Sequence, residues 1–167
     1  MPHETFHDLY VDELRDLWSA EKQLLAALPR MAKAASSAEL QQAFKTHEEE
    51  TAQHVKRLEE ICRSLEVSPR GKRCVGMDGL IAEGKEMMSN GFDGTVLDAG
   101  LIAAAQRVEH YEIAGYGTAR SWAEQLGYDD QAQLLQATLD EESATNETLT
   151  GLARTINFEA DEDAEDN

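Results

Sequence analysis

Cysteine, proline and aromatic residues are scarce in this chain of 167 residues, which has 2 cysteines, 3 prolines and 6% aromatic residues. So few prolines and scattered glycines favour a globular, largely helical protein. No apolar run approaches the roughly 20 residues that a membrane-spanning helix needs, so we expect no membrane partner. Cys62 and Cys74 show no CxxC spacing. The N-terminal sequence has acids where a secretory signal has bases, so we expect reduced thiols in the cytoplasm.

Basic residues are also few, because 15 Lys and Arg face 33 Asp and Glu and the net charge is −18. An acidic protein repels phosphate, so nucleic acid is not an expected partner. The end of the chain, EADEDAEDN, is rich in acids and has no apolar periodicity. It predicts a disordered acidic tail at 159–167, after a single domain at 1–158.

Apolar residues recur at helical spacing in four long segments, predicted as helices over 5–35, 38–65, 96–127 and 131–156. Short links join the first helix to the second and the third to the fourth, so each pair should be antiparallel. The segment 66–94 between the pairs has turn residues and a short amphipathic stretch at 79–89. The pattern therefore predicts an all-α four-helix bundle with one long crossover, containing a short extra helix, between helices two and three.

Each long helix has a glutamate in the middle of its apolar stripe. These are Glu21, Glu50, Glu109 and Glu142, and Glu112, His47 and His54 lie beside them on the same faces or their edges. Buried carboxylates need a cation, because an unpaired buried charge is unfavourable. Carboxylate with imidazole suits iron or manganese, and one carboxylate can bridge two ions. In the metal-free protein we expect the pKa of Glu21, Glu50, Glu109, Glu112 and Glu142 to be raised by burial and mutual repulsion.

A simpler interpretation needs no metal. A single buried glutamate is more often paired with Arg or hydrogen-bonded to Tyr, and Arg57, Arg120 and Tyr116 are available partners. His47 fits a metal ligand and a buried hydrogen-bonding histidine equally well, and His54 ranks below it. What favours metal is that all four helices place a carboxylate in register while few basic residues point inward.

Long stretches of the chain are similar to a known family. YVDELRDLWSAEKQLLAALPRMAKAA, HEEET, KRCVGMDGLIAEG, LIAAAQRVEHYEIAGYGTARSWAEQLG and LLQATLDEES resemble the YciE/YciF-like stress proteins of the ferritin-like superfamily. The likeness extends from residue 6 to about residue 156. It implies a ferritin-like bundle, commonly dimeric, with a dinuclear metal centre.

The resemblance also assigns residues to the centre. Glu21, Glu50, Glu109 and Glu142 match the inward carboxylates of the four helices, and His47 matches a family histidine in His-x-x-Glu-Thr. Position 54 is often not histidine in the family. The sequence departs from rubrerythrins and bacterioferritins, since Gln53 follows Glu50 and Thr145 follows Glu142 at the i+3 position, so both Glu-x-x-His pairs are missing.

The functional expectation is a stress-response protein with two iron or manganese ions inside the bundle that react with dioxygen or peroxide. Its expected ligands are Glu21, His47, Glu50, Glu109, Glu112 and Glu142. The alternative is a non-enzymatic dimeric scaffold whose buried acids bind no metal tightly. We expect a homodimer in either case, because Trp18, Trp122, Met87 and Met88 could leave an apolar patch on the closed bundle.

Overall fold

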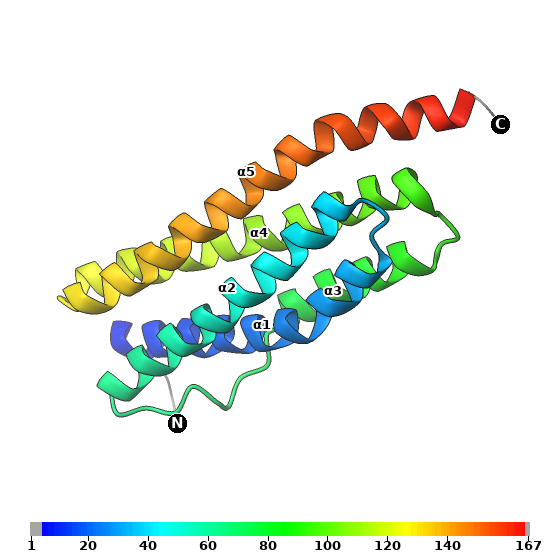
Figure 1. Ribbon diagram of the computed structural model, residues 1–167. Helices are drawn as coiled ribbons and strands as arrows, with labels where there is room; N and C mark the ends of the chain where they lie inside the picture. Colours follow the sequence, from blue (N-terminus) through cyan, green and yellow to red (C-terminus); the bar gives the residue numbers. More distant parts are fainter. Residues whose placement is uncertain (1–4, 166–167) are drawn as a thin grey trace.

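The computed structural model describes residues 5–165, which form five α-helices and no strand (Figure 1). The helices are α1 (Phe6–Ala34), α2 (Ala38–Ser64), α3 (Val75–Ser89), α4 (Gly94–Gln125) and α5 (Asp129–Glu165). The prediction of an all-helical protein is therefore confirmed. Among these helices, none is long and apolar enough to cross a bilayer.

The four long helices lie side by side along one axis (Figure 1). α1 and α2 run in opposite directions, as do α4 and α5, whereas α2 and α4 run in the same direction. The connection from α2 to α4 must therefore return along the length of the molecule. The segment 65–74 makes the first part of that return, and α3 continues it while packing against α1 and α4.

Helix α3 begins four residues before the predicted start at Gly79. Cys74 is its N-cap residue, and the Cys74 thiol accepts a hydrogen bond from the Met77 amide at 3.3 Å. Cysteine is not among the usual capping residues, so no clear start signal precedes this helix. The starts of α1 and α2 follow ordinary capping rules, since Thr5 and Asp8 form a capping box for α1 and Ser37 caps α2.

A buried aspartate holds the turn between α1 and α2. The two carboxylate oxygens of Asp98, on α4, accept hydrogen bonds from the amides of Ser36 and Ser37 at 2.7 and 2.8 Å. A carboxylate at the start of a helix is also favoured by the helix dipole. Asp98 thus attaches α4 to the start of α2.

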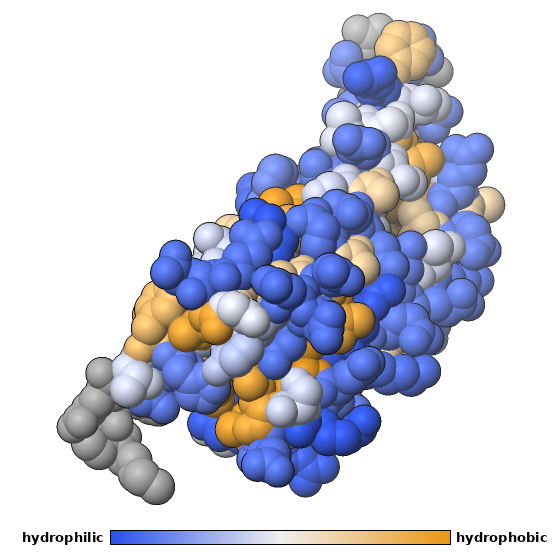
Figure 2. Space-filling model, turned by 90° about the vertical axis from the view of Figure 1, so that its left-hand side faces the viewer, coloured by the Kyte–Doolittle hydropathy of each residue, from blue (hydrophilic) through white to orange (hydrophobic). Residues whose placement is uncertain are grey.

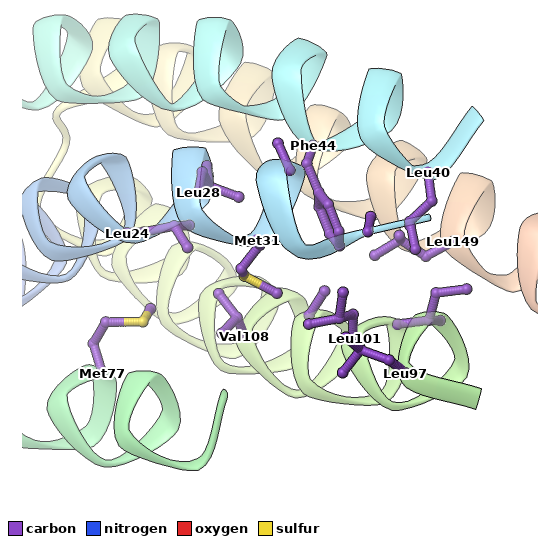
Figure 3. Close-up of a cluster of buried hydrophobic side chains, with 14 of the residues drawn as sticks. Leu24, Leu28, Met31, Leu40, Phe44, Met77, Leu97, Leu101, Val108 and Leu149 are labelled. Carbon is purple, nitrogen blue, oxygen red and sulfur yellow. The ribbon is translucent and has the colours of Figure 1, made fainter. Parts of the chain in front are cut away.

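The core consists of two apolar clusters separated by a layer of polar side chains. One cluster includes Leu24 and Leu28 of α1, Phe44 of α2, Leu101 of α4 and Leu149 of α5 (Figure 3). The other includes Leu14 of α1, Leu58 of α2, Tyr116 of α4 and Leu135 of α5. Each long helix therefore changes from one cluster to the other along its length. The buried polar residues lie near these changes, as expected of an interior site rather than a surface one.

Helix α5 extends beyond the predicted end at Ile156 and is helical to Glu165. Disorder of the acidic tail at 159–167 stays a prediction, and residues 166 and 167 lie outside the described part. The segment carries Glu and Ala, which favour helix once a long helix exists to propagate. Along this segment Phe158 is 64% exposed.

The predicted apolar patch of two tryptophans and two methionines does not form as one surface. Met87 and Met88 pack against the cluster around Leu24, whereas Trp18 and Trp122 pack against the cluster around Leu14. On the face shown in Figure 2, apolar side chains reach the surface in small groups separated by hydrophilic ones. These four residues therefore do not support a dimer through one shared patch.

Candidate metal centre

The polar layer brings together six side chains that can bind a metal ion. They form two groups in which the ligand atoms lie within 4.8 Å of one another. We call the first the His47 group, made of His47, Glu109, Glu112 and Glu142, and the second the His54 group, made of Glu21, His54 and Glu142. All six residues are buried, and Glu142 belongs to both groups.

Glu142 lies between the two histidines. Its Oε1 is 2.8 Å from His54 Nδ1, and its Oε2 is 3.9 Å from His47 Nε2. The carboxylate is 0% exposed, so water cannot solvate it from outside. A carboxylate that directs one oxygen toward each of two imidazoles has the arrangement of a bridging ligand between two cations.

The remaining members complete each group. In the His47 group, Glu109 Oε1 is 3.0 Å from His47 Nε2. In the His54 group, Glu21 Oε1 is 3.2 Å from His54 Nδ1. Glu112 is fully buried, and neither of its oxygens has a hydrogen-bond partner.

Several of these atoms are close together without being aligned for a hydrogen bond. His47 Nε2, His54 Nδ1 and both oxygens of Glu142 have no hydrogen-bond partner despite the separations given above. Buried polar atoms are nearly always satisfied, and an exception requires an explanation. Ligand atoms that point at a common cation would approach one another in this way, so the residues present fit a metal ion.

Side chains around the His54 group hold it in place. Tyr116 donates its hydroxyl hydrogen to Glu21 Oε1. His54 Nε2 lies 2.8 Å from Glu141 Oε2, and Arg57 donates to both oxygens of Glu141 at 2.6 and 2.9 Å. A second partner for a ligand histidine fixes its ring and raises its basicity, as outer partners do in metal sites.

The two histidines are strong bases in the metal-free protein. Burial alone would lower the pKa of His54, but the adjacent carboxylates of Glu142 and Glu21 raise that pKa to about 10. Burial likewise opposes the charge on His47, yet Glu109, Glu50 and Glu142 raise its pKa well above the ordinary value. Both imidazoles therefore hold a proton at neutral pH when no metal is present.

The glutamates do not all behave as the sequence suggested. Burial and then repulsion from neighbouring carboxylates raise the pKa of Glu112 well above its usual range, and burial does the same for Glu142. Burial would raise the pKa of Glu109 too, but the adjacent His47 charge outweighs it and lowers that pKa. The prediction of a raised pKa was therefore wrong for Glu109, because it ignored the protonated histidine.

Five of the six expected ligands meet in the centre, namely Glu21, His47, Glu109, Glu112 and Glu142. The sixth, Glu50, is outside both groups at the edge of the bundle, where its side chain is 34% exposed. His54, ranked below His47 from the sequence, is fully buried in the centre. The sequence signal that could have identified His54 is its position on the apolar stripe, one turn beyond Glu50 and two turns beyond His47.

The two arginines that were available as partners for the buried glutamates pair with other residues. Arg57 pairs with Glu141, and Arg120 pairs with Glu124. Within the described residues, no Lys or Arg forms an ion pair with Glu21, Glu109, Glu112 or Glu142. Tyr116 does bond Glu21, so the simpler interpretation holds for one oxygen of one carboxylate.

Sequence comparison identifies the family. The family described as "Domain of unknown function (DUF892)" matches residues 5–161. The chain belongs to the DUF892 family. Protein YciF of Escherichia coli strain K12 is 47% identical to this family member over 92% of this chain and 93% of its own. The crystal structure of that E. coli stress protein superposes with a TM-score of 0.89, covering 92% of this chain and 97% of its own.

More distant structures show the fold class. Ferritin-like, diiron-carboxylate proteins from Bacillus anthracis align with a TM-score of 0.70 at 16% identity, over 92% of this chain and 99% of theirs. A dodecameric thioferritin from Bacteroides fragilis aligns at 0.69 and 16% identity, over 96% of this chain and 92% of its own. This DUF892 protein is therefore a ferritin-like helical bundle, as its resemblance to the YciE/YciF-like proteins implied.

Proposed function

We propose that this protein binds a dinuclear centre of iron or manganese inside its helix bundle and acts in the response to stress. The observation that carries the proposal is the buried Glu142 carboxylate between His47 and His54. Glu109 and Glu112 would complete one metal site, and Glu21 the other. The stress role is supported by the similar E. coli protein, which is described as a stress protein.

Iron or manganese would supply the redox chemistry, because each can exchange electrons with dioxygen or peroxide. The chain's own residues would bind the ions, orient the ligands and exclude water. The two apolar clusters keep bulk water from the centre on both sides, which strengthens every charge interaction inside it. Glu141 and Arg57 orient the His54 ring, and Tyr116 holds the Glu21 carboxylate.

One observation favours the alternative scaffold role. Both histidines have raised pKa values, and so do Glu112 and Glu142. Two protonated histidines and two protonated glutamates would leave a nearly neutral centre that needs no metal. In that case the polar layer would serve to fix the register of the helices, a role known for some buried ionic groups.

Metal analysis separates these two functions. Protein purified without chelators and titrated with Fe(II) or Mn(II) should bind up to two ions per chain. Glu109→Ala should reduce this sharply, because it removes a ligand that no neighbour can replace. Glu49→Ala, an exposed carboxylate on the same α2 helix as His47, is the control and should bind as the wild type does. Unchanged metal content in Glu109→Ala would favour the scaffold.

We further propose a homodimer in the cytoplasm. Phe6 and Leu9 are exposed near the start of α1, and the Phe6 ring packs edge-on against Trp122 with centroids 5.7 Å apart. Such neighbouring apolar groups suit a contact between two copies. Cys62 and Cys74 are free thiols, which accords with a reducing compartment. A monomer by light scattering at micromolar concentration would contradict the dimer.

A further inference from the structure

The contact between α2 and α5 is closed along one part of its length. Near the end of α2, Gln131 donates to the Ser64 hydroxyl at 3.1 Å. Closer to the centre, Arg57 joins α2 to α5 by two hydrogen bonds to Glu141 and a third to Thr138 at 3.1 Å. These bonds join the two helices on the side of the His54 group.

The same contact opens beyond the centre, on the side of the His47 group. A groove of about 450 Å³ lies there between α2 and α5. Its polar lining consists of Glu39, Gln42, Thr46, Glu50, Thr145 and Thr148. Carboxylate, amide and hydroxyl oxygens are ligands for hard divalent cations, and no Lys or Arg lines the groove to repel them.

Glu50 connects the groove with the buried centre. Its side chain is 34% exposed, yet its Oε2 lies 3.7 Å from His47 Nδ1. Thr145 donates to the same oxygen at 3.2 Å. His47 is only 3% exposed, and its Nδ1 has no hydrogen-bond partner. Glu50 therefore reaches water with one part of its side chain and a buried, unsatisfied member of the His47 group with another.

Two other hollows offer no comparable path. A cavity of about 30 Å³ beneath α3 is lined by Leu24, Met31 and Val108 among other residues. A cation there would lose water without gaining oxygen ligands, which is unfavourable. A hollow on the outer surface of α4 and α5, beside Gln106 and His110, includes none of the six residues of the centre.

We propose that the groove between α2 and α5 is the route by which a divalent cation enters the protein, and that Glu50 passes the ion to the His47 group. This inference depends on the proposed metal-binding function. Glu50 acts as a positioning residue on the route and is not a permanent ligand. It lowers the barrier to entry because its negative charge receives the ion before the ion has lost all its water.

The test measures rates of metal uptake separately from affinity. Metal-free protein is mixed with Co(II) in a stopped-flow instrument and followed by the absorbance of bound cobalt, and release is followed after a chelator is added. Glu50→Gln should slow uptake and release by the same factor, about 10-fold. The amount of cobalt bound at equilibrium and its affinity should stay as in the wild type.

Two further variants make the result decisive. Glu49→Gln removes the same charge from an exposed position on α2, and it should take up cobalt at the wild-type rate. Thr145→Leu keeps Glu50 but fills the groove and removes its hydrogen bond, so it should also slow uptake.

Equal uptake rates in Glu50→Gln and Glu49→Gln would overturn the route. A weaker affinity with an unchanged uptake rate would make Glu50 a permanent ligand and would also overturn it. If the wild type binds no cobalt, iron or manganese, the proposed function itself fails, and the route fails with it.

Discussion

The two halves of the centre share one carboxylate but differ in their surroundings. In the His54 group, Tyr116 donates a hydrogen bond to Glu21, Glu141 is hydrogen-bonded to His54, and Arg57 donates to Glu141. The His47 group has more unsatisfied atoms, including both oxygens of Glu112, and lies next to the groove at Glu50. The His54 group is held in place by neighbouring side chains, whereas the His47 group has polar atoms that only an entering ion would satisfy.

This difference predicts different properties for the two proposed metal sites. Ligands that are fixed by outer hydrogen bonds favour one coordination geometry, whereas unsatisfied ligands can move as an ion binds or changes its oxidation state. We therefore expect the His54 side to hold its ion more firmly, and the His47 side to exchange its ion with solvent.

Removing the shared carboxylate should have the largest effect. In Glu142→Ala both groups lose a ligand, so both ions should bind at least about 100-fold more weakly. Glu21→Ala should weaken mainly one ion, because Glu21 belongs only to the His54 group. Calorimetric titration with Mn(II) would measure both constants. A Glu142→Ala protein that retains one ion at wild-type affinity would show that the carboxylate does not join the two sites.

A substitution away from the centre should change stability without changing metal binding. Asp98→Ala leaves the amides of Ser36 and Ser37 without their partner and should lower the free energy of unfolding by about 2 kcal/mol. Denaturation in urea would measure this loss. The variant should still bind two ions, so it controls for effects of lower stability on metal content. A loss of metal in Asp98→Ala would weaken every assignment that rests on metal content alone.

A smaller effect is expected from the outer residues of the His54 group. Arg57→Met keeps an unbranched apolar side chain but removes the guanidinium group, so Glu141 loses its bidentate partner. The His54 ring should then be held less firmly, and the ion on that side should bind about 10-fold more weakly. The ion on the His47 side should be unaffected. Equal weakening of both ions would remove the distinction between the two halves.

The fold and most residues of the centre could be predicted from the sequence. Apolar periodicity located the four long helices, and Glu21, Glu109 and Glu142 were visible as exceptions within their stripes. The ranking of His47 and His54 could not be settled in this way, because both lie on α2 and only their partners on the other helices tell them apart. Glu50 shared the stripe as well, and its exposure depends on the opening between α2 and α5.

Other differences between the predictions and the structure arose from effects that the local sequence pattern does not show. Cys74 begins α3 although cysteine is not a usual cap, because its position is fixed by bonds from its own backbone and thiol to Ser19 and Tyr111. The length of α5 was underestimated because the acidic composition of its end was weighed above its helix propensity. The pKa of Glu109 depended on a cation contributed by another helix.

The pH dependence of the metal-free protein follows from the shifted groups. Glu112 and Glu142 have raised folded pKa values, so the folded state holds more protons than the unfolded state near neutral pH. His47 and His54 act in the same direction, since their contribution is complete below the unfolded histidine pKa and is lost as pH rises through the folded one. Stability should increase as pH falls from about 8 to about 5.5, by about 1.4 kcal/mol per pH unit for each extra proton held.

Bound metal reverses this preference, because it stabilises the ionised carboxylates and the neutral imidazoles. The most direct test of the central claim is therefore thermal unfolding of metal-free and Mn(II)-loaded protein between about pH 8 and about pH 5.5. A metal centre predicts that the loaded protein melts well above the metal-free protein at pH 8, and that the difference shrinks as the pH falls. If the two forms melt together at every pH, the buried acids and histidines of this bundle do not form a metal site.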